Sequence, residues 1–126
     1  MHPALAIEDL RAFLPAKDLA TSKNFYRALG FEQVWASDTL VLFQLGRLSF
    51  FVQDYFVKEW AENMMLELRV ADAQAYFKHL QNLELAERFP TLVRIGAPVD
   101  DVAKRIRRGH FVDPSGVLWH FCQAIG

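Results

Sequence analysis

The feature of this sequence that most constrains its fold is an internal repeat. Asp18 is followed by the run at 25–29 (Phe-Tyr-Arg-Ala-Leu), and Asp72 is followed by the run at 76–80 (Tyr-Phe-Lys-His-Leu). Each copy comes after an apolar run of strand length, at 10–16 and at 64–70. Each aspartate precedes a segment with helical spacing and can cap its first turn. The sequence therefore predicts the same strand-helix unit twice.

Three further strands are predicted after each helix. In the first copy they span 31–36, 39–45 and 48–53, with short turns between them. In the second copy the corresponding runs are 92–97, 109–112 and 117–123, separated by a polar loop at 98–108 and a turn at 113–116. The predicted fold is α+β, with two βαβββ modules at about 8–54 and 63–124 in a single domain of residues 1–126.

A four-stranded sheet with a helix on one face leaves its other face uncovered. Two such modules, or two chains, can cover these faces by pairing. We therefore expect a half-barrel of curved sheet with the helices outside and a cavity inside, assembled as a homodimer. The segment 54–63 joins the modules, and its aromatic residues Tyr55, Phe56 and Trp60 either line a dimer crevice or pack on their own domain.

Charge and composition narrow the classes of partner. The 14 Lys and Arg residues nearly balance 15 Asp and Glu, so no general positive field attracts nucleic acid or an anionic membrane. The cationic run at 104–108 is either a solvated loop or a clamp for an anionic ligand group. A single cysteine, Cys122, and the lack of a signal or membrane-spanning segment predict a cytoplasmic protein.

Two stretches carry a resemblance to a known family. They are Leu14-Pro15-Ala16-Lys17-Asp18-Leu19, with the later Phe25-Tyr26 and Leu29-Gly30-Phe31, and Asp113-Pro114-Ser115-Gly116-Val117-Leu118-Trp119. With the repeat, they resemble the vicinal-oxygen-chelate superfamily of glyoxalases, bleomycin-resistance proteins and extradiol dioxygenases. The chain is most similar to the bleomycin-resistance branch. That resemblance implies antibiotic resistance by sequestration of a planar, partly cationic or amide-rich small molecule in a dimer crevice. It also implies an N-terminal strand that crosses to the partner near Pro15.

The same resemblance identifies four positions where metal-dependent members hold their ion. They lie seven residues before each capping aspartate and in the last strand of each module, and here they are Arg11, Met65, Phe51 and His120. A Zn or Fe(II) site needs about three N, O or S ligands, and only His120 is suited to be one. We therefore expect no metal site and no cofactor, and a binding protein rather than an enzyme.

Side-chain alternation along the strands predicts which residues face the pocket. Leu66 and Leu68 mark the apolar face of their strand, so the alternate residues face the cavity. The inward positions mix aromatic and polar groups, as small-molecule pockets do. The predicted ligand-binding residues are Arg11, Phe13, Phe51, Gln53, Tyr55, Trp60, Met65, Glu67, Arg69 and His120. Two arginines beside one glutamate indicate an anionic or carbonyl-rich ligand, unless Arg69 and Glu67 pair with each other.

Two catalytic alternatives remain open at this point. The first is a metal-dependent lyase or dioxygenase whose relocated ligands are Glu67, His110 and His120. In the second, a cofactor-free isomerase uses Glu67 as its base and His120 as its acid.

Overall fold

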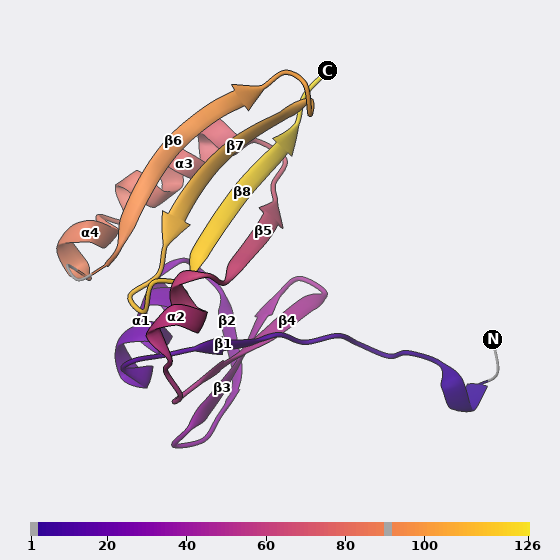
Figure 1. Cartoon of the computed structure of the whole chain (residues 1–126), viewed down its shortest axis with the longest axis vertical. Coiled ribbons are helices and arrows are strands. Elements are labelled where there is room, and N and C mark those ends of the chain that lie inside the picture. Colours follow the sequence, from indigo (N-terminus) through magenta and orange to yellow (C-terminus); the bar gives the residue numbers. More distant parts are fainter. Residues whose placement is uncertain (1–2, 90–91) are drawn as a thin grey trace.

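A computed structural model of the chain describes residues 3–89 and 92–126. The first module contains β1 (Phe13–Pro15), α1 (Leu19–Ala28), β2 (Glu32–Ala36), β3 (Leu40–Leu45) and β4 (Leu48–Gln53). The second contains β5 (Met65–Arg69), α3 (Ala73–Asn82), β6 (Arg94–Asp101), β7 (Ile106–Val112) and β8 (Leu118–Ala124). Three short helices, η1 (Pro3–Leu5), α2 (Lys58–Glu62) and α4 (Leu85–Arg88), complete the order. The predicted repeat of βαβββ modules is confirmed (Figure 1).

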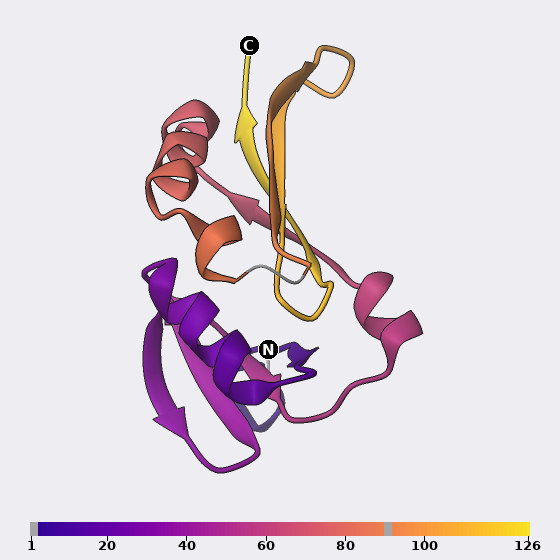
Figure 2. The ribbon, with the colours of Figure 1, turned by 90° about the vertical axis from the view of Figure 1, so that its left-hand side faces the viewer.

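Each module forms one open, four-stranded sheet. The first sheet has the order β1-β4-β3-β2 and the second the order β5-β8-β7-β6, so the two are equivalent. In each, the first strand pairs in parallel with the last, and the other pairs are antiparallel. Figure 2 shows α3 and α4 on one side of the second sheet, while the opposite side carries no helix along its strands. The helices therefore cover one face of a curved, open sheet, as expected.

The predicted helix starts and stop are confirmed. The Asp18 carboxylate accepts a hydrogen bond from the Thr21 amide at 3.3 Å, and Asp72 accepts one from the Ala75 amide at 3.0 Å. Gly30 follows α1 with a φ of +96°, a left-handed conformation that glycine adopts without steric cost. The two aspartate caps satisfy amides that a helix leaves free at its start.

A single hydrophobic core joins the helix-covered faces of the two modules. Phe25 and Tyr26 of α1 are fully buried, as the helical spacing predicted. The Tyr26 ring packs against Phe50 of the first sheet at 5.3 Å and Trp119 of the second at 5.8 Å between ring centroids. Because Tyr26 contacts both sheets, α1 is a structural link between the modules.

A buried hydrogen-bond network strengthens that link. The Tyr26 hydroxyl donates to Asp113 Oδ2 at 2.6 Å and accepts from Trp119 Nε1 at 3.0 Å. Asp113 Oδ1 accepts from the amides of Ser115 and Val117. Burial raises the pKa of Asp113 to about 6, and this effect outweighs the hydrogen bonds from Tyr26 and from the amides of Val117, Ser115 and Gly116, which favour the charged form.

Two predictions about local structure are wrong. The polar loop expected at 98–108 is mostly strand, because β6 extends to Asp101 and β7 begins at Ile106. A β-bulge between Gly96 and Val99 accommodates Pro98, which has no amide hydrogen, and an Arg107–Asp100 ion pair of 2.7 Å closes the hairpin beyond it. The strand expected at 10–16 contains only β1, since the residues before it form an extended arm.

The N-terminal arm leaves the body of the protein. Leu5, Ile7 and Leu10 are 72%, 82% and 90% exposed. Figure 1 shows the arm running away from both sheets. Pro15 lies in the edge strand β1, which agrees with the expected edge position. In the described part of the chain, every helix is too short or too polar to cross a bilayer.

Candidate functional site

The open face of the first sheet carries a row of apolar side chains. Strand register places Phe13 beside Phe51, Phe51 beside Leu42, and Leu42 beside Trp35. The Phe13 and Phe51 rings stack with centroids 4.6 Å apart, and Phe13 and Trp35 are each 50% exposed. We call these four residues the aromatic row. Such a surface on a small protein marks a place where another molecule binds.

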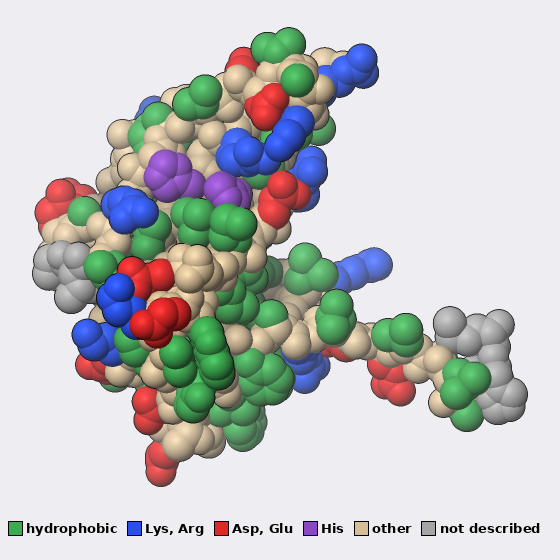
Figure 3. All heavy atoms as spheres, in the orientation of Figure 1, with side chains coloured by type: hydrophobic (Ala, Val, Ile, Leu, Met, Phe, Trp, Pro, Cys, Tyr) green, Lys and Arg blue, Asp and Glu red, His purple; other side chains and the backbone are tan. Residues whose placement is uncertain are grey.

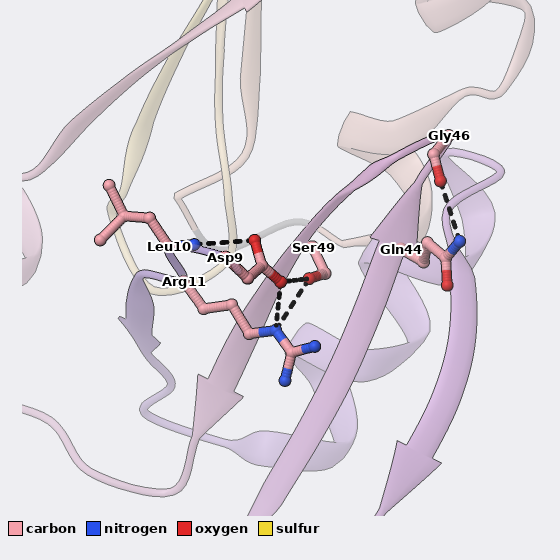
Figure 4. Close-up of polar contacts among 6 residues, drawn as sticks. All are labelled: Asp9, Leu10, Arg11, Gln44, Gly46 and Ser49. Carbon is pink, nitrogen blue, oxygen red and sulfur yellow. Dashed lines mark hydrogen bonds and ion pairs between the residues drawn. The ribbon is translucent and has the colours of Figure 1, made fainter. Parts of the chain in front are cut away.

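A polar cluster flanks the aromatic row (Figure 4). Arg11 Nε lies 2.9 Å from Asp9 Oδ2 and 3.0 Å from Ser49 Oγ. The Arg11 guanidinium also lies 5.7 Å from the centroid of the Phe51 ring, a cation–π contact. The pKa of Asp9 is lowered, most strongly by the hydrogen bond from the Leu10 amide and next by the one from the Arg11 side chain. Arg11 is therefore paired within its own chain.

The open face of the second sheet carries two polar rows. Register places Glu67 beside His120 and His120 beside His110 in one row. The adjacent row runs from Arg69 to Cys122 to Arg108. We call these six residues the polar face. Figure 3 shows histidine side chains next to each other over the second sheet, with cationic and acidic groups around them.

On the polar face, one acidic and one basic side chain are bonded to each other, while two other side chains carry atoms without a partner. Arg69 Nε lies 2.7 Å from Glu67 Oε2, and this hydrogen bond is the main cause of the lowered pKa of Glu67. The pKa of His120 is lowered. Burial is the largest cause, and the positive charge of Arg108 is the next. Arg108 Nε and His120 Nδ1 are shielded from solvent and have no hydrogen-bond partner among the described residues. Two polar atoms on this face thus have unmet bonding capacity.

Gly96 fixes the position of the second histidine. The His110 ring lies directly over the Gly96 Cα, in space that the Cβ of any other residue would occupy. A glycine is therefore required here for close approach rather than for a special backbone angle. Gly96 thus leaves the space in which the His110 ring lies, across the strand pair from His120.

The alternation prediction is confirmed on the second sheet. Leu66 and Leu68 pack against the core, whereas Met65 is 65% exposed and lies in line with Glu67 and Arg69 on the open face. On the first sheet, the buried Leu14 and the exposed Phe13 show the same alternation.

The structure divides the predicted site residues into three groups. Phe13, Phe51 and Gln53 belong to the first sheet, and Arg11 in the arm is bonded to Ser49 of that sheet. Met65, Glu67, Arg69 and His120 belong to the second sheet. Tyr55 and Trp60 lie in the connector, with ring centroids 6.1 Å apart. A single chain therefore does not collect all ten residues on one surface. A cavity of about 680 Å³ lies elsewhere, between α1, α2 and the β7–β8 turn, and shares no residue with either face.

Of the two alternatives for the arginines, the structure bears out the pairing of Arg69 with Glu67, so these two arginines do not support an anionic ligand. Arg11 pairs with Asp9, and Arg69 pairs with Glu67 on the same strand. The unpartnered guanidinium nitrogen belongs instead to Arg108. Sequence reasoning placed Arg108 in a cationic run at 104–108, read as a solvated loop or an anion clamp, and did not assign it to a strand, although alternation from His110 back along the strand would have placed it on the open face.

The aromatic row also contains two residues that the sequence did not identify. Leu42 alternates with the buried Val41 and Phe43, so its place on the open face was readable. Trp35 follows a register shift between Gln33 and Trp35 in β2, and such a shift hides the alternation.

The residues at the four metal positions do not fit a metal site. His120 supplies an imidazole, while Arg11 and Phe51 supply no ligand atom and Met65 only a thioether. Within the described ranges, no group of three or more His, Cys, Asp or Glu side chains is arranged to hold an ion, and this includes the row of Glu67, His120 and His110.

No family model and no curated protein matches this sequence. Among solved structures, the chain is similar to a bleomycin resistance determinant encoded on the transposon Tn5, with 22% identity, a TM-score of 0.77, and 94% of this chain and 98% of that chain covered. It is similar to a bleomycin-binding protein complexed with bleomycin, with 23% identity, a TM-score of 0.76, and 93% and 98% covered. It also resembles the fosfomycin resistance protein FosX from Listeria monocytogenes, complexed with Mn(II) and sulfate, with 15% identity, a TM-score of 0.72, and 94% and 92% covered.

These likenesses extend over nearly the whole chain and show its fold. The protein has the vicinal-oxygen-chelate fold, which its two βαβββ modules define. Within that fold, it is similar to structures of the bleomycin-resistance branch, as its sequence indicated.

Proposed function

We propose that the protein binds a small planar molecule in a crevice between two copies of the chain and sequesters it without converting it. In the proposed crevice the aromatic row of one copy lies opposite the polar face of the other. The observation that carries the proposal is the presence of two incomplete half-sites, one exposed and aromatic and one polar with unpartnered atoms. Small-molecule sites combine apolar walls with a few directed polar groups, and neither face alone provides both.

The exposed apolar surface supports a dimer. The aromatic row and the arm residues Leu5, Ile7 and Leu10 all lose contact with water if a second copy covers them. Pro15 at the edge of the first sheet supports an arm that crosses to the partner. In such an assembly each chain contributes half of each site, so dimerisation and binding depend on the same surfaces.

A similar protein that binds an organic ligand supports this proposal. One of them is a bleomycin-binding protein complexed with bleomycin, and we carry over from it the binding of an organic ligand by this fold. Tyr55, Trp60 and Gln53 would then lie at the rim of the crevice. We also propose one domain for residues 1–126, because the core cluster spans both modules, and a reducing compartment such as the cytoplasm, because Cys122 is buried and unpaired.

The electrostatics of the polar face favour binding over acid–base catalysis. A general base works best when its pKa lies near the working pH. The hydrogen bond from Arg69 moves the pKa of Glu67 in the opposite direction, below its usual range. Glu67 and His120 are cross-strand neighbours, but Glu67 is a weak base in this arrangement.

The test combines molar mass with ligand-induced stabilisation. Light scattering after size exclusion should give twice the chain mass, and a screen of bleomycin-type drugs and planar metabolites should contain compounds that raise Tm. Trp35→Ala should reduce that rise, because it removes part of the stacking surface. Leu48→Ala is the control, since Leu48 is 66% exposed at the end of β4 but alternates with the buried Phe50 rather than with Phe51. A monomer whose Tm no compound changes would refute the proposal.

A further inference from the structure

We infer that the molecule bound in this crevice carries an anionic group such as a carboxylate, held by Arg108 with His120 and His110 on the polar face. This inference rests on the proposed function and specifies its ligand. It starts from the three side chains themselves, which lie on adjacent positions of β7 and β8.

Arg108 is the cation without a balancing charge. The nearest carboxylate on its face, Glu67, is already bonded to Arg69 at 2.7 Å. Arg108 interacts with the Cys122 thiol and with the charge of Glu67 at longer range, while its Nε has no partner. A guanidinium presents its donors in a planar fork that matches a carboxylate, so an anionic group on the open face can pair with the charge of Arg108.

His120 adds a second directed group. Burial and Arg108 lower the pKa of His120, so its ring is neutral near pH 7 and carries a proton on one nitrogen. Nδ1 is shielded from solvent and has no partner among the described residues, so the imidazole faces the crevice as a neutral polar ring beside Arg108. His110 lies directly across the strand pair from His120 and supplies a further ring nitrogen. All three groups lie within two neighbouring rows of the same face.

The opposite wall of the proposed crevice offers little to replace such an anion. Asp9 is bonded to Arg11, and the aromatic row carries no acceptor. Glu32 lies farther away, on the outer edge strand β2. Closing the crevice over Arg108 without an acceptor leaves a charge desolvated and unpaired, which is strongly unfavourable. A cationic ligand would add repulsion to that cost.

The decisive experiment compares three compounds that share one ring system. Titration calorimetry on the intact protein uses naphthalene-2-carboxylate, the neutral 2-naphthamide and the cationic 2-naphthylmethylamine. A charge-assisted hydrogen bond is worth about 1.5–3 kcal/mol, which corresponds to an affinity about 10- to 150-fold higher for the carboxylate than for the amide. The cation is expected to bind most weakly.

Two neighbouring arginines provide a matched pair of variants. Arg108→Gln should remove the preference for the carboxylate and leave the affinity for the amide within about twofold. Arg107→Gln should leave the preference intact, because Arg107 points to the opposite face of β7 and bonds to Asp100. Arg108→Lys keeps the charge but loses the fork, and we expect an intermediate preference. The melting curve of each variant shows whether it is folded.

The outcomes separate this inference from the proposed function. If the amide or the cation binds as tightly as the carboxylate, the anionic group is wrong while the crevice proposal stands. The same conclusion follows if Arg107→Gln and Arg108→Gln change the affinities equally. If none of the three compounds binds, the inference is refuted, and if the protein is also a monomer, the proposed function is refuted as well.

Discussion

Replacing Tyr26 by Phe tests the hydrogen-bond network that joins the two modules. The change removes one oxygen atom from a fully buried ring that contacts both sheets. That oxygen donates to Asp113 at 2.6 Å and accepts from Trp119 at 3.0 Å. Because the ring itself remains, the hydrophobic contacts are preserved and the effect isolates the two hydrogen bonds.

The expected loss follows from what each partner is left with. Losing a hydrogen bond to a charged carboxylate costs about 1.5–3 kcal/mol, and leaving a buried donor unsatisfied costs about 1–3 kcal/mol. Trp119 Nε1 is such a donor, since Tyr26 is its hydrogen-bond partner. We expect Tyr26→Phe to lower the free energy of unfolding by about 3–5 kcal/mol. For a domain of this size the corresponding fall in Tm is about 10–20 °C.

Tyr76→Phe is the matched control. Tyr76 lies in α3 and packs its ring against Phe121 at 5.3 Å, but its buried hydroxyl has no hydrogen-bond partner among the described residues. Burial alone raises the pKa of Tyr76 to about 12. Removing this hydroxyl takes away an unsatisfied polar group, so stability should stay the same or rise by about 1 kcal/mol.

The assay is urea unfolding followed by tryptophan fluorescence and by circular dichroism. The two probes must give coincident transitions for a two-state analysis to hold. Equal losses in the Tyr26→Phe and Tyr76→Phe variants, or a loss below about 1 kcal/mol in Tyr26→Phe, would refute the reasoning.

Three further predictions follow from the structure. Burial raises the pKa of Asp113 from 3.8 to about 6, so the folded state retains a proton that the unfolded state loses between these values. Stability from this group is therefore greatest below pH 4 and falls by about 3 kcal/mol as the pH rises through 6, and urea unfolding of Asp113→Asn at pH 4 and 7 should lack that loss. Gly96→Ala displaces the His110 ring and should weaken naphthalene-2-carboxylate binding several-fold in calorimetry, whereas unchanged affinity would exclude His110 from the site. Because the four metal positions supply a single imidazole, from His120, neither EDTA nor added Zn²⁺ should change Tm, and a rise with Zn²⁺ would contradict this.

Much of the fold was readable because local signals agreed with one another. The aspartate caps, the glycine after α1 and the alternation in β5 each pointed to the element that the structure contains. The failures occurred where a long-range pairing overrides local composition. The segment 98–101 looks like a loop because it is polar and contains Pro98, yet pairing with β7 and the Arg107–Asp100 ion pair keep it in the sheet.

The site was less predictable than the fold for a related reason. Alternation indicates which face of a strand a residue occupies, but not which sheet lies opposite. Arg11 and His120 were expected to share one hollow, and in a single chain they lie on separate sheets. Ion pairs along one strand, such as Arg69 with Glu67, also change the charge that a surface presents. These pairings depend on side-chain geometry that a residue pattern does not contain.

The residues at the metal positions give the two open faces different properties. On the first sheet, Arg11 lies over the Phe51 ring and Phe13 stacks on it, so these groups satisfy one another and form a largely apolar surface. On the second sheet, His120 remains next to the unpartnered Arg108 nitrogen. An ion needs several ligand atoms that converge on one point, whereas an organic molecule can stack on one surface while a charged group on it bonds to the other. The residues at the four metal positions thus favour a ligand with a flat body and a polar end over a bare metal ion.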